Sequence, residues 1–328
     1  MKQFFLTMAG VFAGLFVFFV VVPFILIMSI VASAQPKDTT PAVAVLQLDL
    51  REGLTDQDPE NPFAMFGGSG MSVISVIEAL RHAETDDKVK AVFVRLPEGG
   101  MAPAAADELR QAFLRFRKSG KTIWSHSQGL YPSGVVTSTY MLGAASDQLW
   151  MQPDSSFQAT GFAVEDMFFK RLFEKYGVKA EFEQRREYKN AVNPYLFDNY
   201  TPAHKESELS WMTSIYRTAV LTAAIDRRKE PIAFARVFEA GPYSAEDAKA
   251  KGLIDGVGQV RDTADALLKK AGKKAQLVDF YDYMSTVRRE AKAGSALGGK
   301  PAIAVIGAEG PIMPGTGGGG NPFSGDST

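Results

Sequence analysis

Residues 42–50 read AVAVLQLDL, an apolar run that ends in an acidic and a leucine residue. Such a run is typical of a strand buried inside a sheet. Two further runs have the same character, VKAVFVRLP at 89–97 and KTIWSHS at 121–127. Between these two, apolar residues recur at helical spacing: Leu109, Ala112, Phe113 and Phe116. Strands that alternate with helices predict parallel βαβ units and an α/β layer fold.

The alternation continues toward the C-terminus. We expect helices at 134–144 and 164–177, and strands at 147–153 and 178–186, the last with the apolar/polar alternation of a half-buried strand. A long helix follows. Thr201 is its expected cap and Pro202 lies in its first turn. Its buried stripe is predicted to contain Leu209, Met212, Tyr216, Ala219 and Ala223.

No charged residue lies between Lys2 and Lys37. A bilayer core takes about 20 apolar residues as a helix, and this stretch is long enough, whereas secretory signals have shorter apolar cores. We therefore predict an uncleaved transmembrane anchor, although Ala32-Ser33-Ala34 is similar to a small-residue cleavage site. Lys2 places the N-terminus in the cytoplasm and the residues after Lys37 across the membrane.

An internal repeat shapes the domain prediction. PAVAVLQLD begins at Pro41 and PAIAVIGAE at Pro301, while NPF occurs at 61–63 and again at 321–323. Both pairs are 260 residues apart, which favours a duplication over coincidence. We expect residues 1–40 to form a cytoplasmic tip and anchor, 41–285 a first domain, 286–300 a linker and 301–328 the truncated start of a second repeat. The chain then represents the N-terminal part of a longer protein.

Composition excludes several kinds of site. The chain has no cysteine and only three histidines, in no zinc-binding pattern, and we predict no metal site and no cofactor. GTGGGG at 315–320 is followed by Asn321-Pro322 rather than a helix, which favours a loop over a nucleotide site. A net charge of −1 shows no excess of basic residues of the kind that nucleic-acid-binding proteins carry, so we expect no nucleic-acid partner.

Three short stretches bear on catalysis. Ser125-His126-Ser127 has the residue types of a serine–histidine catalytic dyad. Neighbouring residues on a strand point to opposite faces, however, so we expect His126 to have a structural role. Gly99-Gly100 lies between a strand and a helix, where backbone N–H groups can meet an oxyanion, although ordinary loops have the same composition. RREYKNAVNPY at 185–195 contains Lys189. Most lysines are solvated, and one acts as a base only where burial or a cation favours its neutral form.

Several features together resemble a known family: the anchor, the 260-residue repeat, YKNAVNPY before a long helix, and PYSAEDAKAKGLIDGVGQV at 242–260. They resemble the long, duplicated form of signal peptide peptidase A, a membrane serine protease with a Ser/Lys dyad. The resemblance implies a fold of the ClpP/crotonase superfamily, built from repeated ββα units. It also implies that Lys189 is the general base, although Asn193 stands where relatives often carry an acid.

The resemblance places the nucleophile in the second domain, in a Ser-Gly-Gly stretch at the start of a helix. The matching place in the first repeat is near Thr137, where no such stretch occurs, and Ser133-Gly134 is offset from it. The repeat offset puts the missing serine near position 397, so no nucleophile lies in this chain, which we expect to be inactive alone.

The implied activity is serine endopeptidase cleavage of remnant signal peptides or other unfolded segments at the bacterial inner membrane, with the bulk of the chain periplasmic. The implied partners are the lipid bilayer and further copies in a homo-oligomeric ring. Two alternatives remain: a membrane-tethered pseudoprotease or peptide-binding scaffold that grips peptides at a sheet edge, and a crotonase-like acyl-thioester enzyme using Gly99-Gly100.

Overall fold

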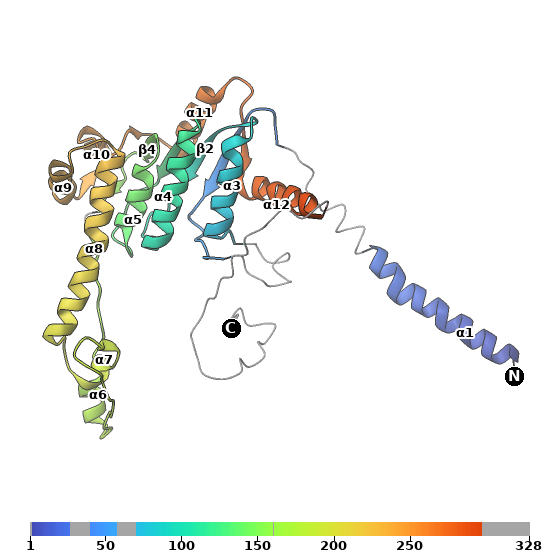
Figure 1. Ribbon diagram of the computed structural model, residues 1–328, viewed down its shortest axis with the longest axis horizontal. Helices are drawn as coiled ribbons and strands as arrows, with labels where there is room; N and C mark the ends of the chain where they lie inside the picture. The colour runs from blue at the N-terminus through green and yellow to red at the C-terminus, as the bar shows by residue number, and fades with distance from the viewer. Residues whose placement is uncertain (1, 27–39, 58–69, 160, 297–328) are drawn as a thin grey trace.

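The computed structural model describes residues 2–26, 40–57, 70–159 and 161–296 (Figure 1). The NPF motif at 61–63, the expected second repeat at 301–328 and the small residues at 32–34 lie outside these ranges.

A parallel sheet of six strands is the centre of the fold, in the order β7-β4-β3-β2-β1-β8. Its strands are β1 (Ala44–Asp49), β2 (Val89–Arg95), β3 (Thr122–Ser127), β4 (Gln148–Met151), β7 (Gly256–Val257) and β8 (Gln276–Asp279). The strands expected at 42–50, 89–97, 121–127 and 147–153 are thereby confirmed. A separate antiparallel pair joins β5 (Ser156–Phe157) to β6 (Tyr243–Ser244).

Helices lie on both faces of the sheet, as parallel strands require. One side carries α3 (Val73–Thr85), α4 (Pro103–Lys118), α5 (Val136–Ala144) and α8 (Pro202–Asp226). The other is covered by α11 (Val260–Ala271), whose Leu267 packs in a cluster with Val45, Phe93 and Trp124. Helix α12 (Phe280–Ala296) contacts β1 and α3. The α/β layer fold predicted from the alternation is confirmed.

The core follows the alternation of side chains along each strand. Leu46, Leu48, Val92 and Val94 are fully buried in the main cluster beneath α3 and α4. Farther along the sheet, Tyr140 of α5 meets Phe157 of β5 edge-on and stacks on Phe234 of α9 (Pro231–Glu239). Its hydroxyl donates to the Leu253 carbonyl at 2.7 Å, just after α10 (Ala245–Ala250). The core therefore continues from β1 to α9 and α10.

Helix α8 carries a projection away from the sheet. We define the arm as residues 161–214, which contain α6 (Lys170–Lys175), η2 (Asn190–Val192), α7 (Asn193–Leu196) and the first half of α8. Figure 1 shows α6 and α7 set apart from the sheet, at the far end of α8. The cap of α8 is as expected, since the Thr201 hydroxyl accepts a hydrogen bond from the amide of His204.

Three expectations for the arm are wrong. Residues 178–186 form no strand, and Val178 and Phe182 are 52% and 48% exposed. The helix expected at 164–177 is restricted to Lys170–Lys175, although it does end at Gly177, which has a φ of 70°. Leu209 is exposed, whereas Ala219 and Ala223 are buried. The physical reason is shared: the arm projects away from the sheet, so its apolar side chains do not join the main core cluster.

The N-terminal segment begins with α1 (Lys2–Phe16) and continues through a π-helical stretch, η1 (Val17–Val21). Thr7–Leu26 is long and apolar enough to cross a membrane, with a mean hydropathy of 2.7. This fits a membrane-anchored protein, although a signal sequence meets the same criterion. At the other end, α12 continues across the expected domain boundary at 285, and Val287 packs against the core.

Candidate active site

The loop after β2 and the start of α5 meet at the edge where the strands end. The Gly100 amide donates to the Ser133 carbonyl at 2.5 Å, and the Thr139 hydroxyl donates to the Gly99 carbonyl at 2.7 Å. A Cβ on Gly100 would lie 2.2 Å from the amide nitrogen of Val135, so this approach requires glycine. The N–H of Gly100 is thus engaged within the chain rather than presented to a substrate oxygen.

Thr137 stands in the first turn of α5, at the position that the repeat matches to the nucleophile expected in the second domain. Its side chain is 1% exposed. Neither the Thr137 hydroxyl nor that of Ser138 has a hydrogen-bond partner among the described residues. Ser133, the nearest serine to the family pattern, lies in the exposed loop before α5. A threonine so deeply buried does not present an attacking oxygen to a peptide.

Lys189 lies on the arm, directly before η2. Its backbone is held on both sides: the amide donates to the Arg186 carbonyl at 3.3 Å, and the carbonyl accepts from the Gln184 side chain at 2.8 Å. The side chain is exposed, and no hydrogen bond or ion pair joins its Nζ to another described residue. Within the described chain, the Lys189 side chain is therefore open to solvent.

Stacked aromatic rings hold the segment that follows Lys189. Tyr195 of α7 stacks on Phe173 and Phe182, with ring centroids 6.2 and 5.3 Å apart. The amide of Phe169 donates to the carbonyl of Pro194 at 2.7 Å. The side chain of Asn193 is buried, and its Oδ1 accepts from Gln184 at 3.2 Å. Asn193 thus has a structural role in holding this turn.

The histidine of the Ser125-His126-Ser127 stretch is structural, as expected. His126 is fully buried, and its Nε2 lies 2.9 Å from the Gly258 carbonyl. Burial lowers the pKa of His126 below its ordinary value. The hydroxyl of Ser125 is bonded instead to that of Ser146 at 2.5 Å. No nucleophile–base pair exists at this strand.

Polar side chains where the strands end were missed by the sequence reasoning. Arg51 donates to both carboxylate oxygens of Asp49, at 2.9 and 2.6 Å, while Arg95 and Arg51 share the amide oxygen of Gln128. Burial raises the pKa of Asp49, but the hydrogen bonds from Arg51 outweigh it and hold the pKa below its ordinary value. Ligands of open α/β sheets bind at the edge where the strands end. The polar residue at the end of each strand was therefore the feature of the sequence that could have predicted this cluster.

Among the described residues, no group of three or more histidine, aspartate or glutamate side chains is placed to hold a metal ion.

Comparison with known proteins identifies the domain. Residues 115–276, which run from the end of α4 to the start of β8, match the model of peptidase family S49. This chain contains a peptidase S49 domain. Protease 4 of Salmonella typhi is 26% identical over 271 residues, covering 78% of this chain and 42% of that protein. The chloroplastic serine protease SPPA of Arabidopsis thaliana is 26% identical, covering 82% and 38%.

The chain spans about four tenths of the length of these curated relatives. A protein of Enterococcus faecium named signal peptide peptidase SppA is 25% identical over 199 residues, covering 58% of this chain and 54% of its own. The resemblance inferred from the repeat and the lysine segment is thus confirmed at the level of the family.

Similar solved structures include the membrane-bound stomatin-specific protease 1510-N in complex with a substrate peptide. The TM-score is 0.37 at 13% identity, and the match covers 76% of this chain and 99% of that chain. An enoyl-CoA hydratase/isomerase family member has a TM-score of 0.30 and 12% identity, covering 69% and 74%. At these scores the likeness adds nothing to the argument for the S49 domain.

The S49 domain therefore brings together some expected features and separates others. The glycine loop and the start of α5 meet, and Thr137 lies beside them on the first turn. Lys189 lies on the arm, with an exposed side chain. The described residues contain no assembled Ser/Lys dyad.

Proposed function

We propose that this chain is the anchor and the lysine-bearing domain of a membrane serine endopeptidase that degrades remnant signal peptides. The match of residues 115–276 to peptidase family S49 carries the proposal. Lys189 would act as the general base, taking a proton from a serine hydroxyl and returning it to the leaving amine. The serine would come from a second domain, because the matching position here is the buried Thr137.

Exposed apolar residues on the arm support the proposal that a second domain or a neighbouring copy packs against the arm and completes the active site. Eleven large apolar side chains between 164 and 211 are exposed: Val164, Met167, Leu172, Tyr176, Val178, Phe182, Tyr188, Tyr195, Phe197, Leu209 and Trp211. Apolar side chains exposed in this number on one segment indicate an interaction surface. Covering it would also remove water from Lys189, as a lysine base requires.

The test compares the 328-residue chain with the complete protein in detergent, using a quenched fluorescent signal peptide. We expect no turnover by the chain alone. In the complete protein, Lys189→Ala should lower kcat at least about 100-fold, the usual lower limit for general acid–base catalysis. Lys179→Ala is the matched control, because Lys179 is an exposed lysine of the same arm, and it should retain activity.

Turnover by the 328-residue chain would refute the missing nucleophile, and an active Lys189→Ala variant would remove Lys189 from the mechanism. The exposed arm also favours the second candidate, a peptide-binding scaffold. That function would be indicated if the complete protein binds the signal peptide without cleaving it.

In the proposed protein the anchor lies in the bacterial inner membrane and the S49 domain on the periplasmic side, in a homo-oligomeric ring. No nucleic acid, metal or cofactor enters the mechanism. Chemical crosslinking of the complete protein in membranes would test the ring, since a monomer would yield no higher species.

A further inference from the structure

The edge at which the strands begin is lined by basic side chains, which the proposed function does not use. We define the basic edge as nine exposed residues at or just after the ends of α4, α8, α10 and α11: Lys118, Arg228, Lys229, Lys249, Lys251, Lys269, Lys270, Lys273 and Lys274. Because each of these helices runs antiparallel to the strands it packs on, their C-terminal ends gather at one edge of the sheet (Figure 1).

Three aspartates near this edge are engaged within the protein, whereas Asp87, just before β2, is exposed. Asp147, Asp226 and Asp255 pair with Arg117, Arg110 and Arg227, at 2.8, 2.5 and 2.9 Å. By contrast, no ion pair to a described residue is found for any of the nine basic side chains, although Lys270 lies over the Trp124 ring and Lys251 over that of Tyr243. The edge therefore carries an excess of positive charge toward solvent.

Helix dipoles account for only part of this charge. Cations stabilise the last turn of a helix, which explains Lys118, Lys249, Lys269 and Lys270. That effect falls off beyond the last turn, yet Lys229, Lys273 and Lys274 lie past their helices. The opposite ends of α10 and α11 are acidic, with Glu246, Asp247 and Asp262 in their first turns. In α10 and α11 the acidic and the basic helix ends thus lie at opposite edges of the sheet.

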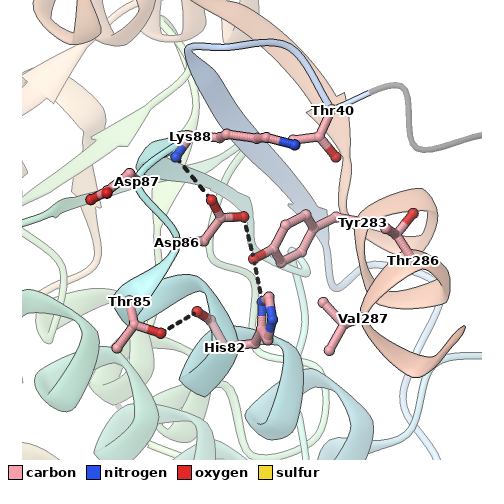
Figure 2. Close-up of a pocket in the computed structure, with 9 residues that line it drawn as sticks. All are labelled: Thr40, His82, Thr85, Asp86, Asp87, Lys88, Tyr283, Thr286 and Val287. Carbon is pink, nitrogen blue, oxygen red and sulfur yellow. Dashed lines mark hydrogen bonds between the residues drawn. The ribbon is translucent and has the colours of Figure 1, made fainter. Parts of the chain in front are cut away.

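The chain enters the sheet at this same edge. Figure 2 shows Thr40 beside Lys88, at a cavity of about 330 Å³ where β1 and β2 begin. The amide of Ala44 donates to the Lys88 carbonyl at 2.8 Å. Thr40 is only fourteen residues from Leu26, the end of the apolar span, so it lies within roughly 50 Å of it even if the chain between is fully extended.

We infer that the basic edge docks on the anionic headgroups of the bilayer that holds the apolar span. The partner is chosen by charge and by tethering: an anionic surface attracts lysines within a Debye length, and the span keeps that surface in reach. Docking through this edge turns the opposite edge and the arm away from the lipid. The glycine loop and the start of α5 then lie on the side of the sheet remote from the membrane.

Single labels test this orientation, because the chain has no cysteine of its own. Ala250→Cys places a fluorophore between Lys249 and Lys251, and Ala104→Cys places one in the first turn of α4, at the opposite edge. The full chain is reconstituted in vesicles with a headgroup-linked energy acceptor, made from phosphatidylcholine alone or with about one third phosphatidylglycerol. We expect phosphatidylglycerol to raise energy transfer from the Ala250 label and not from the Ala104 label.

The triple variant Lys269→Gln, Lys273→Gln, Lys274→Gln removes charge from the basic edge. Each lysine near an anionic surface contributes about fivefold to the docking equilibrium, so the phosphatidylglycerol effect should be lost. Lys175→Gln, Lys179→Gln, Lys205→Gln is the matched control, since these are exposed lysines of the arm. Salt at about 1 M, where the Debye length is about 3 Å, should also abolish the effect.

Equal transfer from the two labels in both lipid mixtures would overturn the inference, as would a phosphatidylglycerol effect that survives the triple variant. The label comparison uses unaltered lysines, so it decides the question even if the triple variant fails to fold. Inorganic phosphate at matched ionic strength should leave the transfer unchanged, and a specific loss of transfer would indicate a phosphate-ion site instead of a membrane surface.

Discussion

The contact of Gly100 with the start of α5 gives a sharp test of how the candidate site is built. The perturbation is Gly100→Ala, and the matched control is Gly99→Ala on the neighbouring residue. An alanine Cβ at 100 would lie 2.2 Å from the Val135 nitrogen and 2.6 Å from its carbonyl carbon. Backbone atoms cannot rotate away, so the loop or α5 must shift.

The expected cost follows from two contributions. Overpacking of a rigid contact costs about 1–3 kcal/mol. Loss of the hydrogen bond from the Gly100 amide to Ser133 adds about 1 kcal/mol. Gly100→Ala should therefore lower the free energy of unfolding by about 2–4 kcal/mol. At position 99 the nearest atom is the Ser133 Cβ at 3.3 Å, an exposed side chain that can move, and the effect should stay within about 1 kcal/mol.

Urea unfolding in detergent, followed by tryptophan fluorescence, measures the difference. Trp124 and Trp150 are stacked with centroids 5.9 Å apart on β3 and β4, so they report on the sheet. A difference between the two variants below about 0.5 kcal/mol would show that the loop is not held against α5 as described.

Two further outcomes are expected. Asp226→Asn should lower the free energy of unfolding by about 3 kcal/mol, because it breaks a buried bidentate pair with Arg110 that joins α8 to α4. Arg110→Met combined with Asp226→Leu should recover most of that loss. Additive single effects in a double-mutant cycle would contradict this expectation. For His126, burial lowers the pKa in the folded state, so the unfolded chain binds the extra proton first as pH falls below about 6.5. The free energy of unfolding should therefore decrease between about pH 6.5 and 5, and His126→Gln should flatten that slope; equal slopes would exclude this role.

Much of the fold was predictable from local patterns. The strands β1 and β2 are mostly apolar runs, and α3 and α4 carry a buried stripe, so these elements follow from their own residues. The caps at Ser72 and Thr201 are local as well, since a hydroxyl there accepts the amide three residues on. The structural role of His126 also followed from its strand position.

The arm was not predictable in the same way. Residues 178–186 have the alternation of a strand, and Leu209 lies on the expected stripe of α8, yet both are exposed. A local pattern states which face is apolar, but not whether anything covers it. The ion pairs at Asp49, Arg51 and Arg95 were missed for a related reason, because they join strand ends that are distant in sequence.

By itself, the sequence determined the apolar span, the parallel α/β alternation, the 260-residue repeat and the lysine segment that resembles a peptidase family, because each depends on neighbouring residues or on internal comparison. Only the tertiary structure decided that Thr137 is buried, that the Gly100 amide is already bonded, and that Lys189 lies exposed on an arm. It also places basic residues from the ends of four helices together at the basic edge. Burial and convergence depend on how separate elements pack, and no local pattern contains that information.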